Sequence, residues 1–458
     1  MRFTKFGKAF LMSALSVGAI LGITSCVQSY TVGYLYVTGT DSSSSTNNGI
    51  ISGFKIDHNK GGLTPINGLP ISSGGANPNR AVLLSGSRFI YVLNRGVNSS
   101  GGGVCTVSDP CSGSNITLFA IGGNGILSPQ DVQFFSQGRN PIRIFADTTG
   151  TFLYVLDHDS PDNFAPSYNP LTNGCTLALG VGVQTCGDIT AFSINSNTGR
   201  LTLVQNAQVT SASGAALSYF PVPANPIDFV LASTFVETVS GTPTTGDTVF
   251  PYTYASSTGQ LTINSNSAQP LNVGGATEIV SANSFVYVLD NEPLTYIPVN
   301  ETAQVTVPSQ ILPFTVGTAG ALQQETGGVV PGDPNLENPI YLIAESTNKF
   351  VYVAYQGNNN TSTTAADSGI AGWVIDTATR ELTPEISGSP FGTGAGPVCL
   401  VEDPSNQFVY TANFLDSTVT GSSIDVQAGV LAQLPGTANK SYPLRGPASW
   451  CIVTGRTS

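Results

Sequence analysis

The sequence has few charged side chains and few of the residue types that dominate metal and nucleic-acid sites. Charged residues make up 10% of the 458 residues, and 16 Lys and Arg against 28 Asp and Glu give a net charge of −12. A chain this acidic lacks the basic surface that nucleic acids require. We therefore expect no nucleic-acid partner. There are only two histidines, His58 and His158, and no Cys-x-x-Cys pair. We therefore expect neither a metal nor a cofactor.

Long apolar runs are also missing, except near the N-terminus. Three basic residues precede an apolar run, Ala9–Ile23, which is too short to span a bilayer but has the length of a signal-peptide core. The run ends in Ile-Thr-Ser-Cys at residues 23–26, which resembles the bacterial lipobox. We predict that residues 1–25 are a lipoprotein signal peptide, that Cys26 is lipidated, and that residues 26–33 form a short tether. The alternative is an ordinary secretory signal with an incidental cysteine.

This N-terminus predicts export and attachment to the bacterial cell envelope, on the periplasmic or outer-membrane side. No later segment is apolar enough for a membrane span, so we expect membrane contact through the lipid alone. Six cysteines follow Cys26, and an even number in an exported chain predicts disulfides. Proximity in the sequence favours the pairs Cys105–Cys111 and Cys175–Cys186. Cys399 and Cys451 are then left to pair with each other.

One short motif, an aromatic and an aliphatic residue followed by Tyr-Val, recurs along the chain. Six clear copies start at Tyr34, Phe89, Phe152, Phe285, Phe350 and Phe408. The gap between the third and fourth copies is about twice the others, and Asn225–Leu231 followed by Ser233–Val239 fits a degenerate copy there. Internal repeats of this length indicate a repeat architecture with seven units.

Each copy stands second in a unit of four expected strands. An apolar run after Pro precedes it, and an alternating strand and a turn followed by Leu-Thr come after it. Four antiparallel strands per unit predict an all-β fold, a seven-bladed β-propeller over residues 34–458. The chain begins on a second strand and ends on Ser449–Val453, an apolar run of the first-strand kind. We expect this run to pair beside Tyr34–Val37 and close the ring.

The loops and turns of this unit carry further expectations. The long insertions at 95–115, 158–187 and 357–369 connect second to third strands, so they should gather on one face. Gly199 and Gly259 occupy turn positions that favour positive φ. Polar residues recur at the ends of second strands, and we expect them to cap turns rather than catalyse. They are Asn94, Asp157, Asp290 and Asn413.

The repeat resembles the lactonase-type seven-bladed propellers, related to bacterial 6-phosphogluconolactonases and fungal muconate-lactonizing enzymes. The resemblance is carried by Asp403–Asn413, with its turn and Phe-Val-Tyr strand, and by Asp376–Pro384 followed by Gly388–Phe391. It extends over nearly the whole predicted mature chain. These residues build turns and strands, so they indicate the type of blade rather than its chemistry.

The resemblance also implies where a site would lie. In the family, Gly-Pro-Arg-His begins a first strand and a Glu follows a second-strand Asn; the His serves as acid or base and the Arg holds a carboxylate or phosphate. Here the residues two after the strand-initial Pro are Arg80, Arg143, Asp228, Tyr341, Cys399 and Ser449, and none is His. We predict that Arg80 and Arg143 clamp an anionic group at the central mouth. His158 or Glu292 would supply proton transfer.

Two classes of function remain open. Because the family's His is missing from that position, we expect a binding or scaffolding module of the cell envelope. Such a module would be a monomer that uses the loop-rich face for a protein, peptide or glycan. The alternative is a lactonase, similar to 6-phosphogluconolactonase, that hydrolyses a sugar lactone at the central mouth. A general base beside a carboxylate-binding Arg would distinguish the two.

Overall fold

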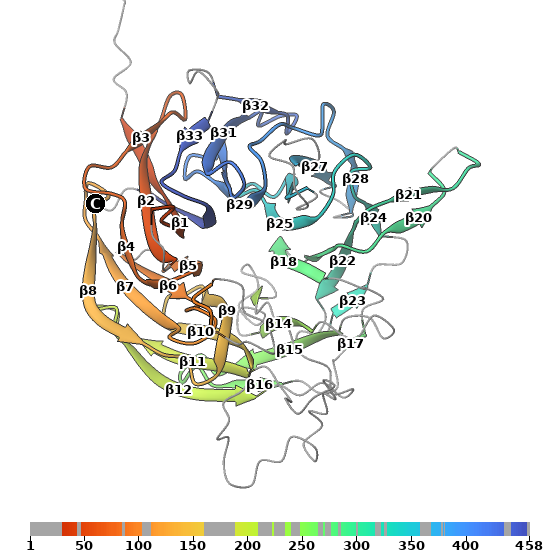
Figure 1. Ribbon diagram of the computed structural model, residues 1–458. Coiled ribbons are helices and arrows are strands. Elements are labelled where there is room, and N and C mark those ends of the chain that lie inside the picture. The colour runs from red at the N-terminus through yellow and green to blue at the C-terminus, as the bar shows by residue number, and fades with distance from the viewer. Residues whose placement is uncertain are drawn as a thin grey trace, which may run out of the picture.

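Every clear copy of the Tyr-Val motif lies in a β-strand, and the strands assemble into sheets arranged around a central axis (Figure 1). Within the described residues there is no helix, and so none that could span a membrane. This computed structural model describes residues 30–43, 47–84, 88–102, 111–159, 188–208, 222–223, 234–239, 248–263, 269–270, 276–282, 285–298, 301–316, 322–324, 328–357, 368–376, 379, 381–434 and 441–455.

The first three sheets hold the N-terminal strands. One contains β34 (Ala448–Gly455), β1 (Thr31–Thr40), β2 (Asn48–Asp57) and β3 (Leu63–Pro65), with β4 (Ile71–Ala76) beside β2. The next contains β5 (Pro78–Leu83), β6 (Phe89–Asn94), β7 (Asn115–Ile121) and β8 (Leu127–Phe134). The third contains β9 (Arg139–Ala146), β10 (Phe152–Asp159), β11 (Asp188–Ile194) and β12 (Leu201–Gln208).

The later sheets repeat this order. One contains β13 (Val222–Pro223), β14 (Thr234–Val239), β15 (Thr248–Tyr254) and β16 (Leu261–Ile263), with β17 (Gln269–Pro270). Another contains β18 (Ala276–Ala282), β19 (Phe285–Asp290), β22 (Gln310–Val316) and β23 (Leu322–Gln324), with β24 (Val330–Pro331). Then come β25 (Pro339–Ala344), β26 (Phe350–Tyr355), β27 (Gly369–Ile375) and β28 (Leu382–Glu385). The last holds β29 (Pro397–Glu402), β30 (Phe408–Asn413), β31 (Thr418–Ile424) and β32 (Leu431–Gln433), with β33 (Ser441–Pro443).

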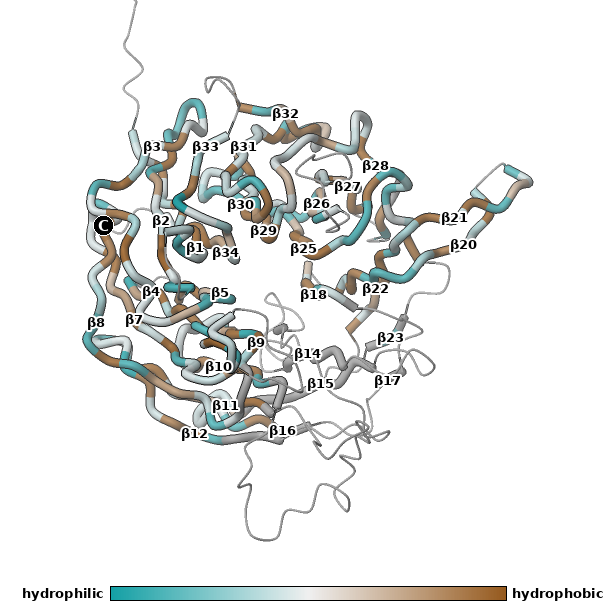
Figure 2. Tube along the Cα trace, viewed as in Figure 1, coloured by the Kyte–Doolittle hydropathy of each residue, from teal (hydrophilic) through white to brown (hydrophobic). Residues whose placement is uncertain are grey.

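This arrangement confirms the predicted all-β propeller with four-stranded antiparallel blades. In the blades with a clear copy of the motif, the strand that carries it is flanked by strands on both edges and by blades on both faces. Its side chains are buried almost without exception. Figure 2 shows hydrophobic residues running along these strands. The degenerate copy is represented by β14, while Asn225–Leu231 lies outside the described residues.

The last strand, β34, pairs with β1, and Cys451 lies opposite Val37 in the register. The predicted Cys399–Cys451 disulfide is confirmed, with 5.9 Å between the Cα atoms, and it links β34 to the innermost strand β29 of the adjacent blade. Cys111 is also disulfide-bonded. Cys26 and the cysteines at 105, 175 and 186 lie outside the described residues.

A hydrogen bond from the motif tyrosine joins each of several blades to the next. The buried hydroxyl donates to the carbonyl of a glycine in the turn before the outermost strand of the neighbouring blade. The pairs are Tyr36–Gly125 (2.8 Å), Tyr91–Gly199 (2.5 Å), Tyr154–Gly259 (3.0 Å), Tyr352–Gly429 (2.8 Å) and Tyr410–Gly61 (2.7 Å). We call this contact the Tyr–Gly joint. The last pair connects the β29 blade to the β1 blade, at opposite ends of the chain.

The glycine of the joint is required for two reasons. Gly61 has φ of 63°, and a Cβ there would lie 2.5 Å from the ring of Phe408, the first residue of that motif copy. Gly259 has φ of 73° and a Cβ would lie 2.3 Å from Phe152. The expected positive φ at Gly199 and Gly259 is therefore confirmed, with 68° at Gly199. The sequence did not reveal that the same glycines receive the aromatic ring of the neighbouring blade.

The polar residues that end the second strands are structural, but they do more than cap turns. Asn94 is fully buried, accepts a hydrogen bond from Ser73 Oγ (2.6 Å) and donates to Asn115 Oδ1 (2.8 Å). Asn413 donates in the same way to Thr418 and Thr420. Asn94 thus ties β6 to β7 and to β4 of the adjacent sheet. The expected structural role holds, and Asp290 Oδ1 also caps the following turn by accepting the backbone N–H of Glu292.

The long insertions at 95–115, 158–187 and 357–369 connect second to third strands, as expected. A fourth connection of this kind was not foreseen from the sequence. Residues 291–309 between β19 and β22 form a hairpin of β20 (Leu294–Tyr296) and β21 (Val305–Val307), which projects outward from the ring (Figure 1).

The Tyr–Gly joint predicts the effect of a minimal change. Tyr410→Phe keeps the ring but leaves the buried carbonyl of Gly61 without its donor. Leaving a buried polar group unpaired costs about 1–3 kcal/mol. We expect the free energy of unfolding in urea to fall by this amount. The matched control is Tyr30→Phe, because Tyr30 is 49% exposed and should have little effect. Equal stability of Tyr410→Phe and wild type would contradict the role of the joint.

A second contact between blades involves a carboxyl group with a shifted pKa. Glu402, at the end of β29, accepts hydrogen bonds from the backbone N–H (2.7 Å) and hydroxyl (3.0 Å) of Ser346 in the adjacent blade. Burial raises the pKa of Glu402 to about 7, although the bonds from Ser346 oppose this; nearby Glu345 and Asp403 add to it. The folded state therefore holds the proton of Glu402 more tightly than the unfolded chain does.

This shift predicts how stability depends on pH. A carboxyl group whose pKa is higher in the folded state stabilises the fold at low pH, and the contribution disappears as pH rises from about 4.5 to about 7. We expect Tm to fall less steeply over this range in Glu402→Gln, which stays neutral and keeps an acceptor for Ser346. Glu337→Gln, at an exposed position, is the control. Identical pH profiles for Glu402→Gln and wild type would show that the shift is not linked to folding.

Candidate functional site

The innermost strands place equivalent side chains at the axis of the ring. In β5, Pro78 pairs with Asn94 and Arg80 with the preceding Leu93, so the register shifts by one residue between them. The same shift occurs in the other innermost strands, β13 excepted. Such a bulge turns the following side chain in a new direction. The residues that directly follow it, here called the axial set, are Arg80, Arg143, Glu278, Tyr341, Cys399 and Trp450.

Arg80 and Arg143, which the sequence placed together at the central mouth, are neighbours in the axial set. Two expected members change. Trp450, and not the expected Ser449, occupies the axial position of β34. The reason is that β34 shifts its register after Ala448 rather than after Pro447. The sequence did not indicate Glu278, because β18 lacks the Pro that marks the other first strands. The position of Glu278 shortly before the Phe285 copy of the motif could have revealed it. Asp228 lies outside the described residues.

Arg80 lies against an aromatic wall. Its Cζ atom lies 3.7 Å from the centre of the Trp450 ring, within the range of a cation–π contact. Tyr341 packs edge-on against the same indole, with 4.9 Å between ring centres and an interplanar angle of 78°. The indole N–H donates to the carbonyl of Ala81 at 3.1 Å. The wall thus joins the β25, β34 and β5 blades.

Opposite charges interact across the axis. Burial raises the pKa of Glu278, and the positive charges of Arg143 and Arg80 lower it. Burial is likewise the largest effect on both arginines and lowers their pKa; for Arg143 the neighbouring Arg80 lowers it further. Both guanidinium groups remain protonated at neutral pH, because their pKa starts above 12. The four side chains that interact here, Tyr341 included, each keep partial contact with solvent.

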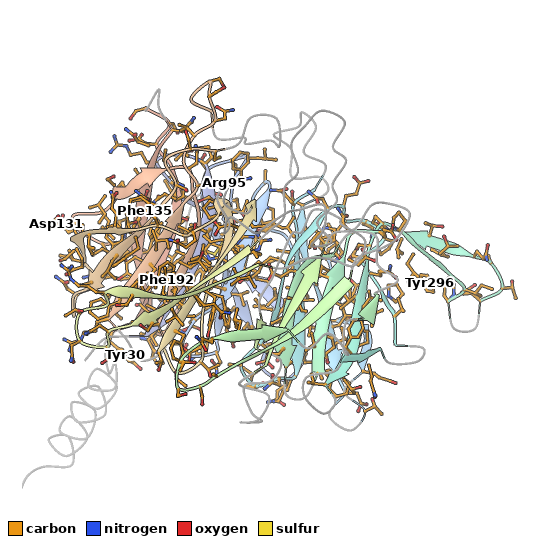
Figure 3. The ribbon with its side chains drawn as sticks, turned by 90° about the horizontal axis from the view of Figure 1, so that it is seen from below. Tyr30, Arg95, Asp131, Phe135, Phe192 and Tyr296 are labelled. Atoms are coloured by element: carbon orange, nitrogen blue, oxygen red, sulfur yellow. A yellow bond between two sulfur atoms is a disulfide. The ribbon has the colours of Figure 1, made fainter. Side chains whose placement is uncertain are left out.

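The centre of the ring is positive in an otherwise acidic chain. Arg95, one residue after β6, also acts on the pKa of Arg143. Among the described residues, Arg80 and Arg143 act on one carboxylate, that of Glu278, whereas the whole chain carries −12. Such a concentration of positive charge attracts a small anion. Arg95 lies toward one face of the disc and Tyr30 toward the opposite face (Figure 3).

Two polar atoms at the axis are buried and, within the part of the chain that the structure describes, have no hydrogen-bond partner. They are Nε of Arg80 and Oε2 of Glu278. Buried charged groups are normally hydrogen-bonded, because an unpaired one is costly. Arg80 has one weak bond of its own, from Nη1 to the carbonyl of Asn79 at 3.4 Å. This arrangement suits a site that is completed by a bound polar molecule.

The other two predicted site residues do not join this cluster in the same way. Glu292 is exposed, on the loop after β19, where its backbone N–H donates to Asp290 Oδ1 at 2.9 Å. The carboxylate that acts on Arg80 and Arg143 is Glu278. His158 belongs to β10, but its side chain lies outside the described residues. Among the described residues, no group of three His, Cys, Asp or Glu side chains could hold a metal.

Comparison with known proteins agrees with this geometry. A family model described as a lactonase, a seven-bladed β-propeller, matches residues 310–447. The part of the propeller from β22 to the residue before β34 thus matches the lactonase type. The chain departs from the resemblance noted in the sequence at the position after the bulge, where no described blade carries a histidine.

Solved structures share the propeller fold. A periplasmic gluconolactonase of Pseudomonas aeruginosa superposes with a TM-score of 0.65 at 17% identity, over 93% of this chain and 100% of that one. A putative 6-phosphogluconolactonase of Bacteroides fragilis gives 0.63 at 14% identity, over 92% and 98%. No curated protein sequence matches the chain significantly. At such low identity these likenesses establish the fold alone.

The axial charges predict how an organic anion binds. Gluconate, a carboxylate without other charge, should bind more weakly to Arg143→Gln, which loses a cation, and more tightly to Glu278→Gln, which loses the opposing charge. Charged hydrogen bonds of this kind contribute about 1.5–3 kcal/mol, so each change should exceed fivefold in Kd by calorimetry. Arg445→Gln is the control, because Arg445 is exposed and paired with Asp41, outside the axial set. Tighter binding of gluconate to Arg143→Gln, or weaker binding to Glu278→Gln, would contradict the electrostatic account.

Proposed function

We propose that the seven sheets form one closed seven-bladed propeller whose axis is a lactone-hydrolysing site. The observation that carries this proposal is the meeting of Arg80 and Arg143 with Glu278, a buried carboxylate with an unpartnered oxygen. A carboxylate of raised pKa suits a general base, and arginines suit the negative charge that develops during acyl transfer. The lactonase type of the blades points to the same chemistry.

The chemistry uses only these side chains and water. Glu278 takes a proton from a water molecule, whose oxygen attacks the carbonyl carbon of the lactone. Arg80 and Arg143 stabilise the negative charge on the carbonyl oxygen of the tetrahedral intermediate. The ring C–O bond then breaks, and the proton held by Glu278 passes to the departing alkoxide. The product is a hydroxy acid, which releases its carboxyl proton to solvent and leaves the arginine pair as a carboxylate.

The substrate class follows from the proteins of similar fold. Their names refer to gluconolactone and, in the putative case, to 6-phosphogluconolactone. We infer an unphosphorylated sugar lactone for this chain, because the signal-like N-terminus ending at Cys26 predicts export, away from cytosolic phosphorylated sugars. Tyr30, four residues after Cys26, lies toward the face opposite Arg95 (Figure 3). A lipid on Cys26 would leave the arginine-lined face directed away from the membrane.

A binding or scaffolding module of the cell envelope is the second candidate. It is favoured by the absence of a histidine from the axial set of the described blades. Glu278 weakens this argument, since it offers a base that the sequence alone did not reveal. The hydrolytic function is therefore preferred.

The decisive experiment compares two glutamates. Wild type should hydrolyse gluconolactone, and Glu278→Gln should lower kcat by about 10²–10⁴-fold, the usual contribution of a general base. Glu301→Gln, at an exposed position on the β20–β21 loop, is the matched control and should retain wild-type turnover. In wild type, kcat should rise with pH as Glu278 loses its proton.

Two outcomes would overturn the proposal. One is a folded wild-type protein that hydrolyses no lactone in a panel of neutral and acidic sugar lactones. The other is turnover that survives Glu278→Gln unchanged. Either result would favour the binding module instead.

A further inference from the structure

Trp450 is one of only two tryptophans in the chain and lies in the strand that pairs with β1. Its side chain is 8% exposed, with one face toward the guanidinium of Arg80 and its edge toward Tyr341. The Pro-initiated first strands of the described blades carry Arg, Tyr or Cys at the equivalent position. Trp450 is thus the largest side chain of the described axial set, and its ring face lies against a cation.

We propose that Trp450 is a positioning residue that holds Arg80 ready to receive a carboxylate. This inference rests on the proposed lactone site, which it deepens by identifying what orients the arginine. Arg80 is a long side chain whose Nε has no hydrogen-bond partner among the described residues. Its weak bond to Asn79 does not fix the plane of the guanidinium, so the indole face is the principal restraint.

The geometry explains why an aromatic face suits this task. At 3.7 Å from the ring centre the guanidinium rests on the face of the indole. A stacked guanidinium keeps its N–H donors at its edge, and that edge is what a carboxylate or oxyanion binds in a two-pronged contact. A carboxylate partner for Arg80 would occupy those donors, whereas an indole leaves them free. Trp450 therefore orients the cation without neutralising it.

The indole is itself fixed relative to Arg80. Its N–H donates to the carbonyl of Ala81, the residue directly after Arg80. The next residue, Cys451, is held to β29 by the disulfide with Cys399, and Trp450 pairs with Thr38 in β1. The ring is thus tied both to the strand that carries Arg80 and to the two strands on its other side.

The test uses product binding as well as turnover. Trp450→Leu should weaken gluconate binding about tenfold, the usual scale of a desolvated cation–π contact, and should raise KM for the lactone more than it lowers kcat. Trp450→Phe keeps an aromatic face and should recover most of the loss. Trp373→Phe is the matched control, because Trp373 is also buried, at 2% exposure, but lies in β27 of another blade.

Fluorescence provides a readout that a purely structural role would not move. Gluconate should change the tryptophan emission of wild type and of Trp373→Phe, and this change should be absent from Trp450→Phe and reduced in Arg80→Lys. Melting curves for all variants separate loss of fold from loss of positioning.

The outcomes distinguish the inference from the function on which it rests. If wild type binds gluconate but hydrolyses no lactone, only the proposed hydrolytic function is wrong. Unchanged gluconate affinity in folded Trp450→Leu overturns the positioning role. Where the Leu variant does not fold, a gluconate-induced emission change as large in Trp450→Phe as in wild type overturns it. A wild type that binds no sugar carboxylate overturns both.

Discussion

The Tyr–Gly joint is the contact on which the rest of the structure depends. Each blade is a small sheet with two apolar faces, and it is stable only when both faces are covered. The joint holds the facing sheets in a fixed alignment. The motif strand of one blade donates a tyrosine hydroxyl to a glycine carbonyl of the next blade, and its first aromatic ring packs against the same glycine. The buried carbonyl leaves little freedom to slide, so in the five pairs of blades that carry the joint the position of one blade fixes that of its neighbour.

Fixed blades explain how a chain with so few basic residues builds a positive centre. The bulge in six of the innermost strands turns one side chain toward the axis, so distant residues such as Arg80 and Glu278 meet without any local motif. The surrounding sheets lower solvent access and strengthen their electrostatic interaction. The aromatic wall of Trp450 and Tyr341 then orients one of the cations. Architecture, not sequence proximity, creates the site.

The sequence predicted what depends on local pattern. Period-two strands, the Tyr-Val repeats, the glycines at positive φ and the Cys399–Cys451 pair all follow from short-range rules or from counting. Arg80 and Arg143 were found because Pro marks the start of their strands. Glu278 and Trp450 were not, since one strand lacks that Pro and the other places its bulge one residue later. Strand register depends on pairing partners far away in the chain, and a single sequence does not reveal it.

The central claim is that the axis binds the carboxylate of a sugar acid formed from its lactone. A crystal structure of the protein soaked with gluconate tests this most directly. The account predicts the carboxylate between the guanidinium groups of Arg80 and Arg143, with Glu278 on the side of the carboxylate carbon and Arg80 still resting on Trp450. Gluconate bound only elsewhere, on the β20–β21 hairpin or between blades, with the axis holding nothing but solvent, would contradict it.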